Sequence, residues 1–408
     1  QALLRNNQPL LAYVAGKAER FTSKDHNFYP GQTVAKQIIV INNSRRTVGF
    51  DCRWTCKLPQ PTSGALSGEL PTGQQHRTPI AVRLPETLPP GQYRLELTTH
   101  FSTGAAQKEV QEDVFLIDVL PRPTPLARSA QVALWDPKGQ TAELLAACGL
   151  AFRRVEPGDD LSQYELLVIG KEALSLDGPG PNLQRVRDGL KVVVFEQTGE
   201  VLEQRLGFRV AEYGLRQVFR RLPDHPGLAG LTEEHLANWR GSATVLPPKL
   251  SYQLDPRRGP LVRWCDIPVP RLWRCGNYGN VASALIEKPP RGNFLPIIDG
   301  GFSLQYCPLM QYREGRGLVL FCQMDVTGRT EQDPAADHLA RNILKYALDW
   351  KPSPRRTAWY AGEAAGKAHL EQIGVKTQDF KGERLSAHDV LIAGPNSVEM
   401  LIQHHAVL

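Results

Sequence analysis

The sequence predicts a multidomain protein: an immunoglobulin-like β-sandwich, a doubly wound α/β domain, and part of a second α/β domain. Three observations lead to this. Short strands separated by Gly, Pro and Asn turns fill the first part of the chain, strands and helices alternate after it, and the final segment repeats the start of the α/β region. With 408 residues, the chain is long enough for two or three domains, each with its own core.

The predicted sandwich spans residues 29–120. Apolar and polar residues alternate in VGFDCRWTCKL, and TPIAVRLPETLPPGQYRLELTTHFS contains two strands around a Pro-Pro-Gly turn. Such closely spaced short strands are typical of sandwiches. Residues 1–28 are expected to be a connector from an absent upstream domain. Residues 121–125 (PRPTP) are expected to be a stiff linker, because prolines lack the N–H that regular structure requires.

The α/β domain is predicted at residues 126–352. Its pattern predicts the strands QVALWD, AFRRVEP, YELLVIG and VVVFEQ, separated by the helices TAELLAACGL and NLQRVRDGL and followed by the helix GEVLEQRLGF. This alternation implies βαβ units and a mainly parallel sheet. An irregular insert at about 208–285 precedes two further strand regions, FLPIIDGGFSLQY and GLVLFCQMDV, and the closing amphipathic helix DHLARNILKYALDW.

Residues 353–408 are predicted to start a second α/β domain. Aligned with the first, Trp359 matches Trp135 and Gly394 matches Gly170. Because three strands cannot complete a doubly wound sheet, two explanations stay open. Either the partner strands belong to sequence not present here, or this tail packs on the first α/β domain.

Composition and charge exclude several classes of protein. The hydrophobic fraction of 41% and the charged fraction of 22% are those of a globular chain. A net charge of +6 is small for this length, and the basic residues are scattered, so no nucleic-acid partner is expected. No apolar run reaches the roughly 18 residues of a membrane helix, so no membrane partner is expected. No cofactor motif is present, and no metal-ligand spacing is found among the cysteines and histidines.

Six of the seven cysteines fall into three groups. Cys148 and Cys322 lie in apolar segments and are expected to be buried thiols. Cys52 and Cys56 share one face of a strand but are too far apart along it for an easy disulfide. Cys265 and Cys275 flank a Pro-rich loop and can pair, although the sequence leaves their disulfide state open. The remaining residue, Cys307, adds no motif.

The turn that follows KVVV is the first candidate site. In α/β sheets, a sharp turn from strand to helix often carries a Cys or Ser nucleophile. Here it consists of Phe195, Glu196, Gln197, Thr198 and Gly199. Gln197 occupies the expected nucleophile position and is neither nucleophile nor base, while Thr198 is the only hydroxyl. The sequence therefore predicts a degenerate elbow that keeps its bend without a reactive atom.

Two further sets of residues are weaker candidates. Asp299 and Asp325 follow apolar strands and can do acid–base work, or they can be a turn residue and the partner of an ion pair with Arg329. His225 can act as a base. Aromatic and basic residues of the insert can contact carbohydrate, or they can simply pack over the sheet edge; these residues are Trp239, Arg240, Trp264 and Trp273.

The chain resembles the region that follows the catalytic barrel in multidomain glycoside hydrolases of the family 2 type. The opening LLAYVAGKAERFTSKDHNFYPGQTVAKQIIVINNSR resembles the segment that leads into a β-sandwich. VVVFEQTG, DHPGLAGL, NWRGSAT and GRGLVLFCQMDVTGR resemble a glutamine-amidotransferase-like (class I, flavodoxin-like), or β-galactosidase trimerisation-like, α/β domain. Amidotransferases of this fold use a Cys at the elbow with a later His and Glu, and Gln197 departs from that pattern.

The resemblance covers nearly the whole chain and implies a non-catalytic accessory, oligomerisation or substrate-cleft region. The implied partners are an upstream catalytic barrel of the same polypeptide, carbohydrate and further copies of the chain, and the implied location is secreted or periplasmic. The first alternative is an α/β hydrolase that uses strand-end carboxylates. The second is a structural or interaction module of a larger assembly. The sequence does not decide the sugar, the linkage or the oligomeric state.

Overall fold

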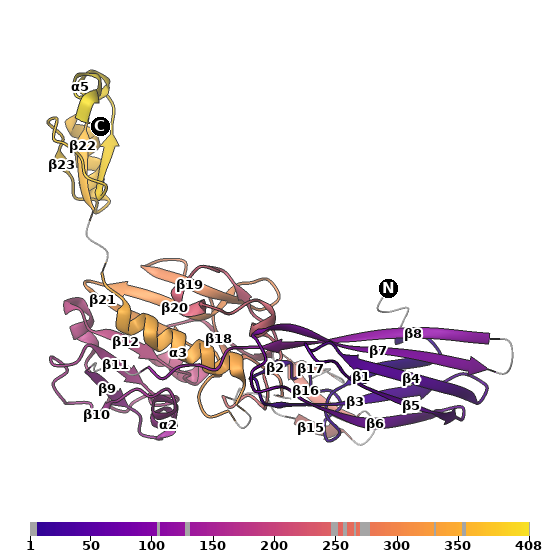
Figure 1. The fold of residues 1–408 in the computed structure, drawn as a ribbon. Coiled ribbons are helices and arrows are strands. Elements are labelled where there is room, and N and C mark those ends of the chain that lie inside the picture. Colours follow the sequence, from indigo (N-terminus) through magenta and orange to yellow (C-terminus); the bar gives the residue numbers. More distant parts are fainter. Residues whose placement is uncertain are drawn as a thin grey trace. The chain divides into compact units, whose positions relative to one another are not determined.

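The computed structural model describes residues 6–103, 107–126, 131–245, 252–255, 259–264, 267–269, 278–329, 332–352 and 356–407. The chain divides into two compact units, Gln1–Trp350 and Lys351–Leu408. Strands are the predominant regular structure (Figure 1). No described helix has the length and apolar character needed to cross a membrane.

The first unit begins with a β-sandwich, as predicted. One sheet has the order β1-β3-β6 and the other the order β2-β8-β7-β4-β5. The strands are β1 (Leu10–Ala15), β2 (Asn27–Phe28), β3 (Thr33–Asn42), β4 (Val48–Cys56), β5 (Thr62–Leu70), β6 (Gln74–Arg83), β7 (Gly91–Thr103) and β8 (Gln107–Val119). Alternate side chains of the two sheets, among them Ile38, Val40, Leu95 and Leu97, meet in one buried core. Cys52 and Cys56 are buried free thiols in this core, as expected.

Residues 10–28 are not a connector, which corrects the prediction for residues 1–28. Strand β1 pairs with β3 along its whole length, from Leu10 opposite Asn42 to Ala15 opposite Gln37, and β2 pairs with β8. The side chain of Gln111 accepts a hydrogen bond from Ala12 N and donates one to Leu10 O, so it also satisfies the outer edge of β1. The sequence did not reveal this, because a single edge strand has no hairpin partner next to it in the chain.

An eight-stranded sheet forms the centre of the α/β region. Its strands, in spatial order, are β10 (Arg153–Arg154), β9 (Val132–Trp135), β11 (Leu166–Ile169), β12 (Lys191–Val194), β21 (Gly317–Cys322), β20 (Tyr306–Glu314), β19 (Phe294–Gly300) and β14 (Phe219–Arg220). The first five are parallel and the last three antiparallel. The four-residue strands β9 and β11 are buried on both faces, which is why the sequence shows them as continuous apolar runs.

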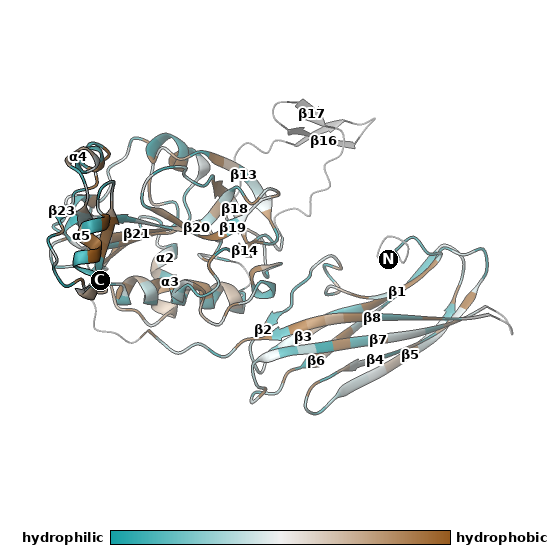
Figure 2. Ribbon diagram, turned by 90° about the horizontal axis from the view of Figure 1, so that it is seen from above, coloured by the Kyte–Doolittle hydropathy of each residue, from teal (hydrophilic) through white to brown (hydrophobic). Residues whose placement is uncertain are grey.

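Helices cover the two faces of this sheet unequally. Helices α2 (Gln140–Ala147) and α3 (Pro334–Asp349) pack on one face, where Leu145, Leu339 and Ile343 meet the sheet (Figures 1 and 2). On the other face, the two predicted helices are reduced to a short 3₁₀ helix, η1 (Leu183–Asp188), and a single π turn, η2 (Val201–Arg205). Left-handed glycines close both early, because Gly189 has φ 125° and Gly207 has φ 75°.

The insert after η2 carries short elements. They are β13 (Val210–Leu215), η3 (Pro226–Leu228), η4 (Glu234–Leu236), β15 (Tyr252–Asp255), β16 (Gly259–Trp264), β17 (Ile267–Val269) and β18 (Ala282–Ile286). Strand β13 pairs with β18, and β15, β16 and β17 form a small separate sheet. Cys265, Cys275 and Trp273 lie outside the described residues, as does the side chain of Trp264, so the disulfide prediction is untested.

The second unit repeats the first three parallel strands of the large sheet. It contains β22 (Thr357–Ala361), α4 (Ala364–Gln372), β23 (Gln378–Asp379), β24 (Asp389–Ala393), α5 (Val398–Gln403) and η5 (His405–Val407). The parallel order β23-β22-β24 matches β10-β9-β11. The strand register corrects the predicted alignment by two residues. Trp135 lies opposite Ile169, just before Gly170, whereas Ala361, not Trp359, lies opposite Ala393, just before Gly394.

Candidate functional site

The predicted elbow lies at the carboxyl edge of the large sheet. Strands β11, β12 and β21 are parallel neighbours, so the residues that follow them gather at one edge. Glu196, Gln197 and Thr198 follow β12, Lys171 follows β11, and Gln323 to Thr327 follow β21. Lys171, Glu196, Gln197, Gln323 and Thr327 are all at most 3% exposed, and we call them the elbow cluster.

Gln197, in the expected nucleophile position, has a fully bonded side chain. Its Oε1 accepts a hydrogen bond from Leu174 N at 3.0 Å. Its Nε2 donates to Gly170 O at 2.8 Å and to Phe195 O at 2.7 Å. A side-chain amide with three such bonds can make few others, and an amide has no nucleophilic lone pair to activate. In this structure, Gln197 therefore connects the ends of two strands.

The other two elbow residues also have structural roles. Thr198 Oγ1 accepts a hydrogen bond from Val201 N at 3.3 Å, in the manner of a cap at the start of η2. Gly199 is needed for space, since a Cβ there would lie 2.3 Å from Glu212 Oε1. The bend therefore persists for packing reasons, with its only hydroxyl engaged.

Glu196 is the titratable group at the centre of the elbow cluster. Its Oε1 accepts hydrogen bonds from Val326 N and Thr327 N, both at 2.7 Å, while its Oε2 is buried and has no hydrogen-bond partner among the described residues. Burial, followed by the charge of Asp325, raises the pKa of Glu196 to about 7. The carboxyl group is therefore partly protonated at neutral pH.

The surroundings of Glu196 also include an amide, a lysine and a thiol. Gln323 Oε1 accepts a hydrogen bond from Gln197 N at 3.1 Å, so an amide faces the elbow from β21. Lys171 Nζ lies 3.5 Å from Thr327 O, to which it donates. The thiol of Cys322 is completely buried, as the sequence predicted, and burial raises its pKa well above the usual value, so it stays a protonated, unreactive thiol. Cys148 is likewise buried.

Asp325 is held in a buried ion pair. Its Oδ2 accepts from Arg329 Nη1 at 2.5 Å, and both side chains are 2% exposed. Thr244 Oγ1 also donates to its Oδ1, at 2.5 Å. Arg329 donates further to Asn280 O, so the pair joins the insert to the end of β21. The ion pair that the sequence suggested as an alternative is therefore present.

Asp299, on β19, also lies at the carboxyl edge of the sheet, but its charged partners differ from that of Asp325. Its carboxylate is 2.8 Å from Lys288 Nζ and 3.4 Å from Arg221 Nη1. The strand β20 separates β19 from β21 in the sheet. Because Asp299 and Asp325 have different cationic partners and share none, the structure does not bring them together as an acid–base pair.

His225 is a capping residue instead of an exposed base. Its Nδ1 accepts a hydrogen bond from Gly227 N at 3.0 Å at the start of η3, and its ring packs against Tyr346 with centroids 4.5 Å apart. Burial lowers the pKa of His225, so the ring is neutral at physiological pH with its proton on Nε2.

The predicted carbohydrate contacts are corrected where the structure describes them. Trp239 is completely buried, its indole N–H donates to His235 O at 2.8 Å, and Arg329 lies over its ring. It therefore cannot stack on a sugar at the surface. Arg240 is half-buried, and its guanidinium donates to Gln32 Oε1 at 2.7 Å and lies over the ring of Phe28. The contacts of both residues fit the alternative interpretation, in which aromatic and basic residues of the insert have a packing role.

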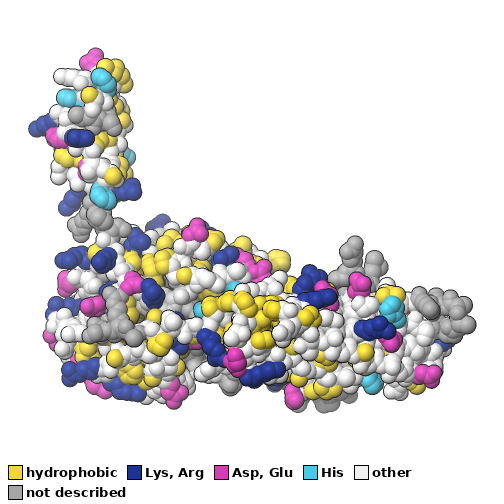
Figure 3. Space-filling model, viewed as in Figure 1, with side chains coloured by type: hydrophobic (Ala, Val, Ile, Leu, Met, Phe, Trp, Pro, Cys, Tyr) yellow, Lys and Arg dark blue, Asp and Glu magenta, His cyan; other side chains and the backbone are white. Residues whose placement is uncertain are grey.

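No group of three or more His, Cys, Asp or Glu side chains among the described residues is arranged to hold a metal ion. On the face seen in Figure 3, basic and acidic side chains are interspersed. The sequence predicted Glu196 only as part of the degenerate elbow, and did not predict its buried carboxyl group with a raised pKa. Its signal was an acidic residue directly after an apolar, β-branched strand, a position that is buried.

Comparisons with known proteins found structural neighbours at low sequence identity. No protein-family model and no curated protein match the chain. It is similar in structure to a CARDB domain from Pyrococcus furiosus, with 11% identity and a TM-score of 0.21 over 27% of this chain and 87% of that one. It is also similar to a PapD-like domain of human CEP192, with 12% identity and a TM-score of 0.20 over 28% of this chain and 87% of that one.

A family 123 glycoside hydrolase from Clostridium perfringens is a further structural neighbour. It has 11% identity and a TM-score of 0.19, over 33% of this chain and 32% of that one. Identities and TM-scores at this level carry no argument about activity.

Proposed function

We propose that this chain is a non-catalytic accessory region of a multidomain, carbohydrate-active glycoside hydrolase of the family 2 type. In this proposal the α/β region is a flavodoxin-like, class I amidotransferase-like domain that lacks its nucleophile. The strand order supports it: numbered along the chain, the five parallel strands have the order 2-1-3-4-5, which doubly wound flavodoxin-like sheets share.

The observation that carries the proposal is the bonding of Gln197. Acyl transfer requires an activated Ser, Cys or Thr at this position and a base within hydrogen-bond reach. Gln197 instead gives both ends of its amide to the backbone of neighbouring strands. The side chain that faces it from β21 is Gln323, an amide in place of a base. In this proposal, the elbow therefore has a structural role in the sheet.

A hydrogen-bonded junction between the sandwich and the α/β region supports a positioning role. His26 bridges Asp118 of the sandwich, at 3.0 Å, and Ala237 O of the insert, at 2.8 Å. A histidine that donates from both nitrogens is charged. Burial alone would lower its pKa, but these two hydrogen bonds outweigh burial and raise it. The buried bridge fixes β2 against the insert.

A second bridge centres on the N-cap of α3. Asp333 accepts hydrogen bonds from Ala335 N at 2.9 Å, from Arg240 N at 2.9 Å and from Asn27 Nδ2 of the sandwich at 3.1 Å. Tyr29 adds a hydrogen bond to Asp337 at 2.8 Å. Since buried polar networks specify one arrangement of the parts that they join, this junction suits a spacer that holds other domains in place.

Assays of the intact chain for hydrolysis of glutamine and of a panel of aryl glycosides test the proposal. The expected result is turnover no faster than that of a heat-denatured control. Turnover that a Glu196→Gln or Asp325→Asn variant abolishes would overturn the proposal and favour the strand-end carboxylate hydrolase. The observation that keeps this second candidate open is Glu196, a carboxyl group whose pKa of about 7 suits general acid catalysis.

A further inference from the structure

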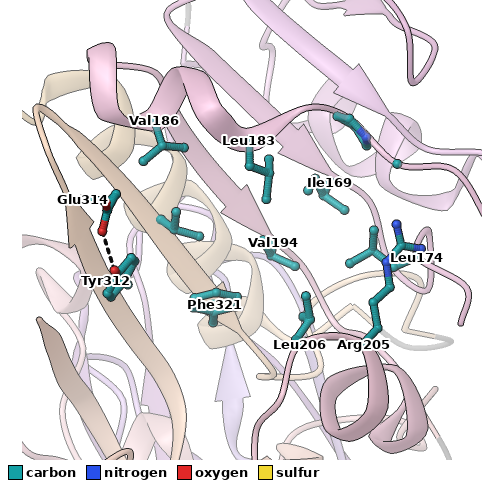
Figure 4. A pocket seen from close by; sticks show the side chains of 13 residues that line it. Ile169, Leu174, Leu183, Val186, Val194, Arg205, Leu206, Tyr312, Glu314 and Phe321 are labelled. Atoms are coloured by element: carbon teal, nitrogen blue, oxygen red, sulfur yellow. Dashed lines mark hydrogen bonds between the residues drawn. The ribbon is translucent and has the colours of Figure 1, made fainter. Parts of the chain in front are cut away.

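An apolar pocket opens on the sheet face that α3 does not cover. Because η1 and η2 are short, the ends of β11, β12 and β21 stay accessible between them (Figure 4). Ile169, Val194 and Val319 form the floor and are each at most 6% exposed. Leu183 stands at the rim and is 38% exposed.

The pocket has the size of a small ligand. Its volume is about 270 Å³. A cavity of about 150 Å³ holds one benzene, so this space accommodates roughly ten to thirteen non-hydrogen atoms. The floor consists of branched aliphatic side chains, with Phe321 and Tyr312 beside it, which favours a flat or branched apolar group.

The charged groups of the pocket leave one positive charge uncompensated. Glu314, on one wall, accepts hydrogen bonds from Tyr312 Oη at 2.5 Å and from Arg187 Nε at 2.8 Å. Arg205 on the opposite wall donates to Ser175 O at 2.5 Å and makes no ion pair with any residue in the described ranges. Figure 4 shows Arg205 beside Leu174, across the floor from Tyr312 and Glu314.

Gly180 makes room for this guanidinium. A Cβ at Gly180 would lie 2.7 Å from Arg205 Nη2, so any larger residue would displace the arginine. The glycine and the hydrogen bond to Ser175 O together fix a cation at the edge of an apolar floor. A planar guanidinium in that position matches a carboxylate, which can accept two parallel hydrogen bonds.

We propose that this pocket binds a small apolar carboxylic acid. The aromatic or branched body lies on Ile169, Val194 and Val319, and the carboxylate meets Arg205. A small molecule is favoured over a protein segment because the space is limited to the size of one bicyclic group. The proposal is independent of the accessory function and concerns a different face of the domain from the elbow cluster.

Titration of the intact chain with 2-naphthoate, followed by calorimetry and ligand-observed NMR, tests the site. We expect saturable binding at one site, and roughly tenfold weaker binding by Arg205→Gln because a charge-assisted hydrogen bond is lost. Arg205→Lys keeps the charge but loses the second parallel hydrogen bond, so its affinity should lie between those of the parent chain and of Arg205→Gln. The neutral 2-naphthylmethanol should bind equally to the parent chain and to Arg205→Gln. Leu183→Trp should obstruct both ligands from the rim.

Arg209→Gln is the matched control, since Arg209 is 85% exposed and lies outside the pocket. It removes the same charge and should leave 2-naphthoate binding unchanged. Circular dichroism establishes that each variant is folded. The proposal is overturned if 2-naphthoate does not bind saturably, if 2-naphthylmethylamine binds as tightly, or if neither Arg205→Gln nor Leu183→Trp weakens binding.

Discussion

Replacing Glu196 by glutamine should remove a pH dependence from the stability of the first unit. The folded-state pKa of Glu196 is about 7, against an ordinary value of 4.5, and burial is the main cause. The folded state therefore binds more protons than the unfolded state between these values, and the free energy of unfolding falls as the pH rises from 4.5 to 7. The difference corresponds to about 3 kcal/mol at pH 8. The amide of the Glu196→Gln variant stays neutral at every pH and avoids this loss.

Urea denaturation of both proteins at pH 5, 6, 7 and 8, followed by tryptophan fluorescence, measures this effect. Glu196→Gln should be close to the parent at pH 5 and about 1–3 kcal/mol more stable at pH 8, allowing for the new amide N–H in place of the unpartnered Oε2. Glu165→Gln is the control, because it removes a carboxylate whose side chain is 56% exposed. A stability difference for Glu196→Gln that stays constant from pH 5 to pH 8 would refute the reasoning.

Three further substitutions have definite expected outcomes. Asp325→Asn should lower the free energy of unfolding by about 3 kcal/mol, because Arg329 is left as an uncompensated buried charge; an unchanged urea midpoint would contradict this. Trp239→Phe should cost about 1–2 kcal/mol through its lost hydrogen bond, and a selective loss of sugar binding at normal stability would restore its predicted role as a sugar contact. The ion pair between His26 and Asp118 stabilises the folded state below pH 6.5, and this stabilisation is lost as the pH rises through the raised folded-state pKa of His26. Asp118→Asn should therefore lower the free energy of unfolding mainly at low pH. Denaturation at pH 6 and pH 9 checks this, since the deficit of the variant must shrink at the higher pH.

The sequence predicted burial correctly where apolar residues form a local pattern along the chain. The apolar runs of β11 and β12 indicated the parallel sheet, and the cysteines in apolar segments are buried as expected. Prediction failed where burial depends on residues distant in the chain. Trp239 lies in an irregular, Arg-rich segment that looks like a surface, and its burial comes from packing against the sheet and against Arg329, far along the chain.

Within the candidate site, the sequence predicted the missing reactive atom but could not show what replaces it. That Gln197 lacks a nucleophilic atom follows from its chemistry alone. That its amide joins the ends of β11 and β12 depends on the strand register, which no local pattern encodes. The raised pKa of Glu196 is caused first by burial and then by the charge of Asp325, which reaches the same edge only after the insert has returned the chain to the sheet.

The second unit shows that the order of strands in a sheet and the burial of those strands have different causes. Its strands have the same 2-1-3 order as the start of the large sheet, yet among the described strands β24 pairs with β22 alone, whereas β11 lies between β9 and β12. All four residues of β11 are buried, but no residue of β24 is, and Val398 and Ile402 of α5 are 65% and 66% exposed. A βαβ pattern therefore suffices to set strand order and direction. Burial of a strand in such a sheet requires neighbouring elements on both of its sides. The four residues of β11 have such neighbours and are buried, whereas the five residues of β24 are not buried.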